Sequence, residues 1–279
     1  MKKLFVVALA VVCLTGFCAK NELYKSKWKH KSIAKGIDLF LTHSKFFKKQ
    51  KLNITVLRLD NSKKKNFKLA LSYVTEKRII SSKHCKDNKA IAAINGGYFN
   101  MKTKKPCAYL KMNGKSATDF YNFRGTRPLC VNGTIEVSKN GIVSLGPAKP
   151  DAEYDADDDV ETVLTTGPVL LFNGEKVDLH IKYDPRHPRS ALGITKDNQV
   201  LLVTVDGRTK ESAGASWGEM QELMKMLGCT EAINLDGGGS TTLVVKNEVV
   251  NKPCNNKKFD NKCERAVSNA LIVVPVKKK

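Results

Sequence analysis

Alternating hydrophobic and polar positions dominate the chain and predict many short strands. Residues 53–60 and 67–74 alternate with a period of two, which is typical of half-buried strands, and the basic turn between them favours a hairpin. Ala90 to Asn95 is a short continuous apolar run, as in a buried strand. Further strands are expected over 134–137, 142–145, 163–172, 190–195, 199–205, 232–236, 241–246 and 266–274.

One helix is clear from its start and stop signals. Ser216 to Glu219 forms an S-x-x-E capping box, apolar residues follow at helical spacing, and Gly228 ends the pattern. Most strands join through short turns, and only one or two helices are evident. The predicted fold class is therefore α+β, a single strand-rich domain with a mixed β-sheet and few helices.

The first nineteen residues read as a targeting segment. Lys2 and Lys3 precede an apolar run over residues 4–14, which is too short to span a bilayer. We therefore expect an exported protein that is secreted, periplasmic or envelope-attached. Lipid attachment at Cys18 stays open beside ordinary cleavage, because Phe17 is bulkier than the small residue that lipoprotein processing prefers. After the signal peptide (1–19), we expect a linker or N-terminal extension (20–45) and one domain (46–279).

The chain carries 48 Lys plus Arg and a formal net charge of +21. The lysines occur in runs that fall in turns, without the interleaved aromatic residues or recognition helix of a nucleic-acid binder, so no nucleic-acid partner is expected. A solvated surface is the favoured interpretation. Attraction to an anionic polymer or a membrane surface is the alternative.

Six cysteines lie outside the signal peptide, and an even number in an exported chain fits disulfides. The most local pair, Cys254 with Cys263, brackets a polar loop. No CxxC or Cys/His cluster has zinc spacing, and we expect neither a metal nor a cofactor.

The sharpest chemical signal is the cluster Gly237-Gly238-Gly239 between two predicted strands, preceded by Asp236 and followed by Ser240. Three consecutive glycines carry a cost in backbone entropy, whereas a tight hairpin turn needs one or two. Such a turn exposes N–H groups to an anion, phosphate in particular. Neither a Walker lysine nor a following helix is present, so this is not a nucleotide-binding fingerprint.

A second signal pairs Arg189, which opens one predicted strand, with Asp206, which closes the next. A turn at Asp197-Asn198 would bring both to the same side of the sheet. The planar fork of Arg189 suits a phosphate, although an arginine at a strand end is often a surface ion-pair partner. His187 fits an acid, a base or a structural role.

Six segments occur in the order seen in the phosphodiester glycosidase domain family, which the chain resembles over about residues 50–275. They are residues 95–99, 166–168, 189–193, 206–208, 234–241 and 265–269. The resemblance implies a hydrolase that cleaves a sugar joined through C1 to a phosphodiester, in an envelope or extracellular glycoconjugate. The Cys254/Cys263 pair also looks like the family pattern.

A phosphate monoester leaves as a stable anion, so the site needs donors around the phosphate and a carboxylate at the anomeric carbon. We assign catalysis to Arg189, Asp206 and Asp236, with one carboxylate as base or nucleophile and the other orienting or donating a proton. The candidate substrate-binding residues are Asn95, Gly96, Gly97, Tyr98, Thr166, Gly167, Arg208, Gly237, Gly238, Gly239, Ser240, Thr241 and Asn269.

Two alternatives remain at this stage. One is a non-catalytic envelope protein that binds an anionic polysaccharide through its basic surface. The other is a metal-dependent phosphodiesterase that uses Asp206 and Asp236 as oxygen ligands and attacks phosphorus. The expected partner is accordingly a sugar-phosphate diester or an anionic glycopolymer.

Overall fold

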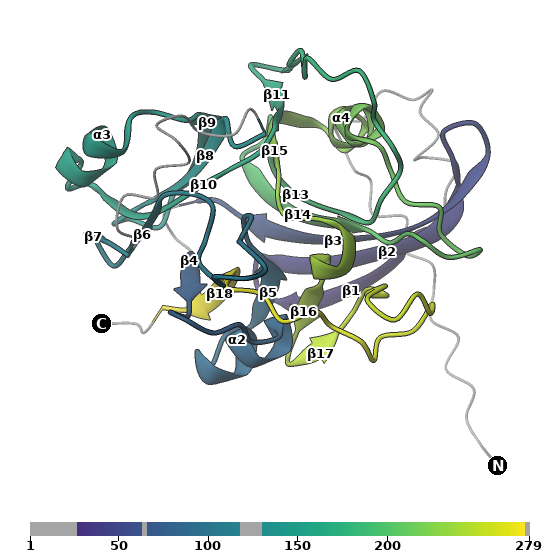
Figure 1. The fold of residues 1–279 in the computed structure, drawn as a ribbon, viewed down its shortest axis with the longest axis horizontal. Helices are drawn as coiled ribbons and strands as arrows, with labels where there is room; N and C mark the ends of the chain where they lie inside the picture. Colours follow the sequence, from purple (N-terminus) through teal and green to yellow (C-terminus); the bar gives the residue numbers. More distant parts are fainter. Residues whose placement is uncertain (1–26, 63–65, 118–129, 277–279) are drawn as a thin grey trace.

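The computed structural model describes residues 27–62, 66–117 and 130–276 (Figure 1). The predicted signal peptide and its Cys18 lie outside these residues. Within the described ranges, no helix is both long enough and apolar enough to cross a membrane.

Three antiparallel sheets make up the described part of the chain. The largest, in spatial order, contains β1 (Lys29–Ala34), β2 (Ile37–Phe46), β3 (Gln50–Asp60), β14 (Gln199–Val205), β13 (Arg189–Thr195), β15 (Cys229–Asn234), β11 (Val169–Phe172) and β12 (Glu175–Lys176). The second contains β17 (Glu248–Val249), β16 (Leu243–Val245), β5 (Ala92–Asn95), β18 (Asn269–Pro275) and β4 (Phe67–Tyr73). The third contains β7 (Lys115–Ser116), β6 (Leu110–Met112), β10 (Val160–Thr166), β8 (Gly133–Ser138) and β9 (Val143–Pro147).

Few helices accompany these sheets. They are α2 (Ser81–Asp87), α3 (Asp151–Ala156), α4 (Trp217–Met226) and the 3₁₀ turn η1 (Gly238–Ser240). The predicted capping box is confirmed, because the Ser216 side chain accepts the Glu219 backbone N–H while the Glu219 side chain accepts that of Ser216.

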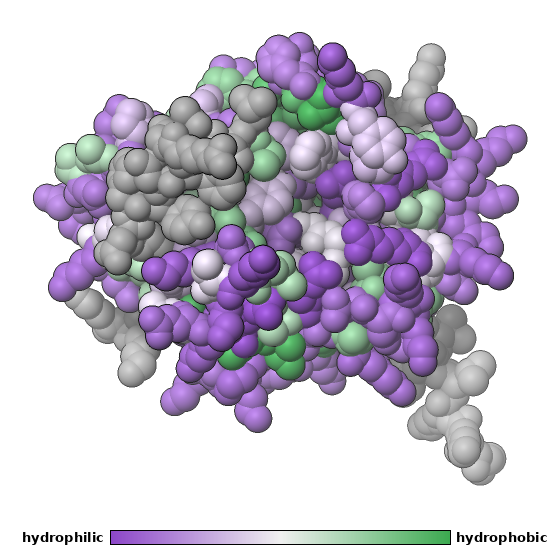
Figure 2. Space-filling view, in the orientation of Figure 1, coloured by the Kyte–Doolittle hydropathy of each residue, from purple (hydrophilic) through white to green (hydrophobic). Residues whose placement is uncertain are grey.

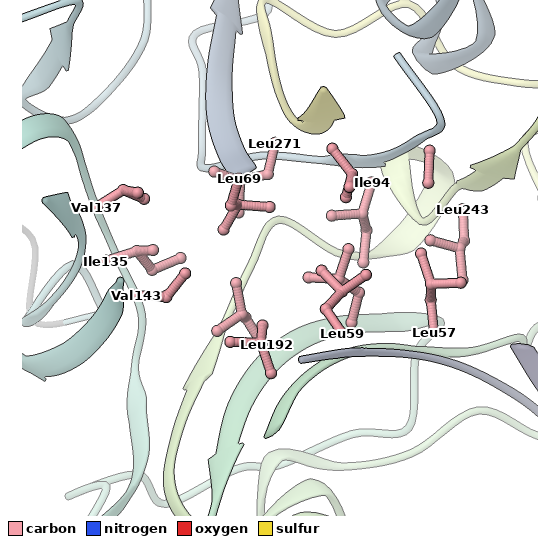
Figure 3. Packing of buried hydrophobic residues seen from close by; sticks show 14 of the residues in the cluster. Leu57, Leu59, Leu69, Ile94, Ile135, Val137, Val143, Leu192, Leu243 and Leu271 are labelled. Carbon is pink, nitrogen blue, oxygen red and sulfur yellow. The ribbon is translucent and has the colours of Figure 1, made fainter. Parts of the chain in front are cut away.

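The main core lies where the three sheets face one another (Figure 3). Leu57 and Leu59 of β3 point into it, whereas Ile54 and Val56 point to the opposite face and pack under α4. Both faces of the large sheet are therefore buried, which fixes the register of its central strands.

The strand-rich prediction is confirmed in outline, but the predicted mixed sheet is wrong. Every strand pairing in the described residues is antiparallel. The physical reason is that parallel neighbours need a long crossover connection, whereas most of these strands follow one another through short turns.

Two further expectations differ from the structure. The predicted linker over residues 20–45 is wrong where β1 and β2 pair with each other and β2 pairs with β3. The predicted hairpin of 53–60 with 67–74 is also wrong, because β4 pairs with β18 in the second sheet. Leu69 instead faces Leu57 and Leu59 across the core, so the shared apolar face makes an inter-sheet contact.

Replacing a side chain in the shared core tests this packing. Leu192 of β13 is 0% exposed, so Leu192→Ala leaves a cavity and is expected to lower the free energy of unfolding by about 2–5 kcal/mol. Ile181→Ala is the control, because Ile181 is 38% exposed and its truncation is expected to change the free energy of unfolding by less than about 0.5 kcal/mol. Urea unfolding measures both, and equal losses would contradict the assigned core.

Candidate active site

Strand ends from two sheets bring the sequence motifs together. In the large sheet, Arg189 pairs with Val205, so Arg189 and the following Asp206 lie at the same end, as the Asp197-Asn198 turn predicts. The second sheet joins this end through Asn95, whose Nδ2 donates to the Asp236 carbonyl at 2.6 Å and whose Oδ1 accepts the Ser190 hydroxyl at 2.7 Å. The glycine cluster, the Arg189 strand and the Asn95 segment therefore form one site.

Two guanidinium groups lie against the glycine turn. A Cβ atom on Gly238 would lie 3.1 Å from Nη2 of Arg208, and one on Gly239 would lie 2.4 Å from Nη2 of Arg265. Gly238 also has a φ of +61°, a backbone conformation that side chains rarely adopt. The Pro188 carbonyl 2.7 Å from a Cβ on Gly237, the positive φ of Gly238 and the Arg265 guanidinium beside Gly239 together explain why consecutive glycines occur here.

Asp236 is the titratable carboxyl of the turn. Burial raises its pKa to about 6, while the Ser240 side chain, the positive charge of Arg265 and the Gly237 amide act in the opposite direction. The residue is still partly exposed, in contrast to most of its neighbours. A carboxyl that changes charge near neutral pH, under the positive charge of Arg265, is suited to proton transfer.

Asp206 has a different environment. Its carboxylate is 1% exposed and accepts hydrogen bonds from Asn53 Nδ2 at 2.5 Å, Asn251 Nδ2 at 2.8 Å and the Lys252 amide at 2.9 Å. Burial raises its pKa, and these hydrogen bonds oppose the shift. The carboxylate therefore ties three chain segments together.

Arg189 points into the protein. Its Nε donates to the Ala215 carbonyl at 2.9 Å and its Nη2 to the Pro185 carbonyl at 3.0 Å, and the guanidinium lies 4.9 Å from the centre of the Trp217 ring. Burial lowers its pKa. This geometry differs from the free fork expected for phosphate binding, since two of the three nitrogens already have backbone partners.

The remaining candidates mostly bond to one another. Tyr98 donates its hydroxyl to the Gly167 carbonyl at 2.9 Å and accepts Nδ2 of Asn234 at 3.0 Å, and its ring is partly exposed. The Gly97 amide donates to Oδ1 of Asn269 at 2.8 Å. Other members of this buried network are Gly96, which has no room for a Cβ beside Asn269, and Thr166, whose hydroxyl donates to the Asn234 carbonyl.

Several buried oxygens around the turn lack a hydrogen-bond partner within the described structure. They belong to Asn234, Thr241 and Thr242. Unpaired buried oxygens also occur elsewhere in the described residues, as on Thr55, Thr134 and Thr204, so this feature alone does not distinguish a functional region from a structural turn.

Some site residues escaped the sequence analysis. Arg265 was visible only as the first residue of a motif, and nothing in the pattern indicated that its guanidinium would pack on Gly239. Asn53 and Asn251, which hold Asp206, gave no signal, because an asparagine beside a strand reads as a turn residue. His187 lies beside the site, with Nδ1 3.4 Å from Nη2 of Arg208, and burial lowers its pKa.

The structure also bears on the expectations for the cysteines and for metal ions. Cys254 lies against the turn, with its Sγ 3.8 Å from the Gly238 carbonyl. All six cysteines of the described residues are free in the structure, including Cys254 and Cys263, whose pairing was one of the possibilities. In the same residues no group of three or more His, Cys, Asp or Glu side chains is arranged to hold a metal ion.

Residues 88–274 match the family model described as phosphodiester glycosidase. A Bacillus subtilis prophage-derived protein, YomE, is 35% identical over 96 residues, or 34% of this chain and 13% of that protein. Mouse N-acetylglucosamine-1-phosphodiester alpha-N-acetylglucosaminidase is 37% identical over 87 residues, or 30% of this chain and 16% of that enzyme. The bovine enzyme is 25% identical over 199 residues, or 65% of this chain and 36% of that enzyme. The chain thus matches about a third or less of the length of these curated relatives.

Solved structures share the fold. The catalytic domain of zebrafish N-acetylglucosamine-1-phosphodiester alpha-N-acetylglucosaminidase superposes with a TM-score of 0.70 at 19% identity, covering 91% of this chain and 88% of that one. A hypothetical protein from Synechocystis gives a TM-score of 0.65 at 17% identity, covering 88% of this chain and 63% of that one.

The charge environment of Asp236 leads to a direct test. Because Arg265 lowers the pKa of this carboxyl, Arg265→Gln is expected to raise it above its value of about 6. Carbon-13 NMR titration of the Asp236 carboxyl measures the change. Arg58→Gln is the control, since Arg58 pairs with Asp38 instead. An Asp236 pKa that stays constant or falls in the Arg265→Gln protein would contradict the described contact.

Proposed function

Because the chain belongs to the phosphodiester glycosidase family, we propose that it is an exported hydrolase that cleaves the bond between C1 of a sugar and a phosphodiester oxygen. Relatives with similar sequences include enzymes whose names specify this reaction on N-acetylglucosamine-1-phosphodiesters. Export is proposed from the basic and apolar leader at residues 1–19.

One observation carries the proposal: Asp236, with a pKa of about 6, adjoins a glycine turn against which Arg208 and Arg265 lie. This combination offers positive charge for a phosphate and an ionisable carboxyl for the carbon to which the phosphate is attached. The reaction needs these two kinds of group, because the leaving phosphate monoester is already an anion and requires donors more than a strong acid.

We assign phosphate binding to Arg208 and Arg265 in place of Arg189. Arg208 is exposed and Arg265 is partly exposed. A guanidinium offers a planar pair of donors that matches two phosphate oxygens. The backbone amides of Gly238, Ser240 and Thr241 already donate to the carbonyls of Pro188, Gly237 and Gly238, so the guanidinium groups are the proposed donors. These fixed donors would stabilise the negative charge that grows on the leaving phosphate monoester.

Asp236 acts as the base in this account. A water molecule attacks C1, the bond from C1 to the phosphodiester oxygen breaks, and the Asp236 carboxylate takes the proton from the attacking water. The sugar keeps the hydroxyl from water and the phosphate monoester leaves with the bonding electron pair. A base with a pKa of about 6 is mostly ionised at pH 7, as the step requires.

Asp206 and Arg189 position the site rather than touch the substrate. Asp206 holds the Lys252 amide and two asparagine side chains, close to the loop that carries Arg208. Arg189 fixes the Pro185 and Ala215 segments beside Trp217. The partly exposed ring of Tyr98 is the proposed contact for the sugar, since its hydroxyl is already bonded.

The reaction itself is tested with UDP-N-acetylglucosamine and a simple alkyl diester of N-acetylglucosamine 1-phosphate. Asp236→Asn is expected to lower kcat by about 100-fold or more, because asparagine cannot accept the proton. Asp197→Asn is the matched control, because Asp197 lies exposed in the turn at the other end of the strands. Release of free sugar measures the rate.

The position of bond cleavage separates the rivals. In oxygen-18 water, attack at carbon places the label in the sugar, whereas a metal-dependent phosphodiesterase would place it in the phosphate. Label in the phosphate, or equal rates for wild type and Asp236→Asn, would refute the proposed mechanism. No cleavage of either substrate, together with salt-sensitive binding of polysaccharide, would favour the non-catalytic alternative.

A further inference from the structure

Positive charge continues outward from the two site arginines along three neighbouring segments. These are the end of the β2–β3 hairpin, the loop that follows Asp206, and the loop over residues 252–265. Their exposed lysines, here called the basic rim, are Lys45, Lys48, Lys49, Lys51, Lys210, Lys257, Lys258 and Lys262.

Direct contacts make the basic rim continuous. The hairpin reaches the loop after Asp206 through the Ala213 amide, which donates to the Lys51 carbonyl at 3.0 Å, and through His43, whose Nε2 lies 2.8 Å from the Glu211 carbonyl. His43 also contacts Phe259 of the 252–265 loop, with ring centres 5.6 Å apart. Figure 1 shows the hairpin end and this loop on the same side of the molecule, where hydrophilic residues dominate the surface in Figure 2.

Three acidic residues lie in the same segments as these eight lysines, namely Glu211, Asp260 and Glu264, so the segments keep a net positive charge. Glu264 accepts hydrogen bonds from the hydroxyl and amide of Ser82 instead. Asp260 accepts the Lys262 amide, which lowers its pKa, with further contributions from Asn256 and from the charges of Lys262 and Lys258. Among the described residues, no basic-rim lysine forms an ion pair with a carboxylate within 4.0 Å.

The basic rim contributes little to the binding of a single small phosphodiester. Charges in solvent are screened over about 10 Å at 0.1 M salt, so the outer lysines act weakly on a phosphate held at Arg208 and Arg265. Each exposed ion pair also contributes little binding free energy by itself. Several lysines in a row become effective when one ligand carries several phosphates, because their contributions then add on a single molecule.

We propose that the basic rim binds the flanking phosphates of a polyanionic chain, so that the substrate is a sugar-1-phosphodiester borne by a polymer with repeated phosphate groups. This inference rests on the proposed function, whose site it extends. Lysine ammonium groups suit such a ligand, because a point charge accepts phosphates in many orientations and lets the chain shift along the surface.

Two substrates with the same reacting linkage test the proposal. One is the alkyl diester of N-acetylglucosamine 1-phosphate, and the other carries this sugar phosphate at the end of a poly(glycerol phosphate) chain. A basic-rim variant combines Lys210→Gln, Lys258→Gln and Lys262→Gln. The control variant combines Lys35→Gln, Lys139→Gln and Lys196→Gln, which are exposed residues in turns at the other ends of their strands and remove the same charge.

The basic-rim variant is expected to raise KM for the polymer about tenfold relative to KM for the small diester. Wild type is expected to show a KM for the polymer that rises more steeply with salt than that for the small diester. The control variant is expected to match wild type in both respects. Equal shifts of KM for both substrates, or equal losses in the basic-rim and control variants, would overturn the proposal.

Failure of the proposed function would give a different result. If wild type cleaves neither substrate, the hydrolase assignment fails, and retention on immobilised inorganic polyphosphate then tests the basic rim alone. Weaker retention of the basic-rim variant than of the control variant supports the surface as a polyanion site. Equal retention of the two overturns it.

Discussion

The packing of two arginine side chains against consecutive glycines is the constraint on which the site depends. Arg208 and Arg265 lie so close to Gly238 and Gly239 that side chains there would collide with the guanidinium groups. Both guanidinium groups therefore bring positive charge to the same turn, with Arg208 exposed and Arg265 partly exposed. Asp236, on which the charge of Arg265 acts, supplies one negative charge, since a carboxyl with a pKa of about 6 is mostly ionised at pH 7. In the proposed function, a substrate phosphate binds to these two guanidinium groups.

The rest of the fold fixes the position of the glycine turn. The glycine turn follows a strand of the large sheet, whereas Asn95 belongs to the second sheet and binds the turn through the Asp236 carbonyl. A shared apolar core joins the two sheets, so the site rests on packed strands and not on loops alone. Many residues expected to contact substrate instead bond to one another, as Gly97 does with Asn269. Such supporting contacts are what keeps a site in a productive geometry.

Local patterns in the sequence predicted the parts that local chemistry determines. The capping box before Trp217 and the turn that aligns Arg189 with Asp206 depend on a few adjacent residues. Partition of the strands among sheets depends on distant partners, so the pairing of β4 with β18 was missed. The lysine-rich composition likewise hid the strands β1 and β2, although residues 37–39 alternate as a strand should.

The sequence also could not predict the direction of side chains, and their directions in the structure changed the roles that we assign to Arg189 and Arg265. Strand position placed Arg189 at the site but could not indicate that it turns toward Ala215 and Trp217. Asp206 lies at the expected end of its strand, and its three donors, from residues 53 and 251–252, are the reason why we propose a positioning role for it. Arg265 became part of the site only through its packing on Gly239.

A crystal structure of the Asp236→Asn protein with a sugar-1-C-phosphonate, which cannot be hydrolysed, tests the central claim most directly. The account predicts phosphonate oxygens within hydrogen-bond distance of both Arg208 and Arg265, with the anomeric carbon facing residue 236. A phosphonate bound away from the two arginines, or a sugar whose anomeric carbon lies far from residue 236, would contradict it.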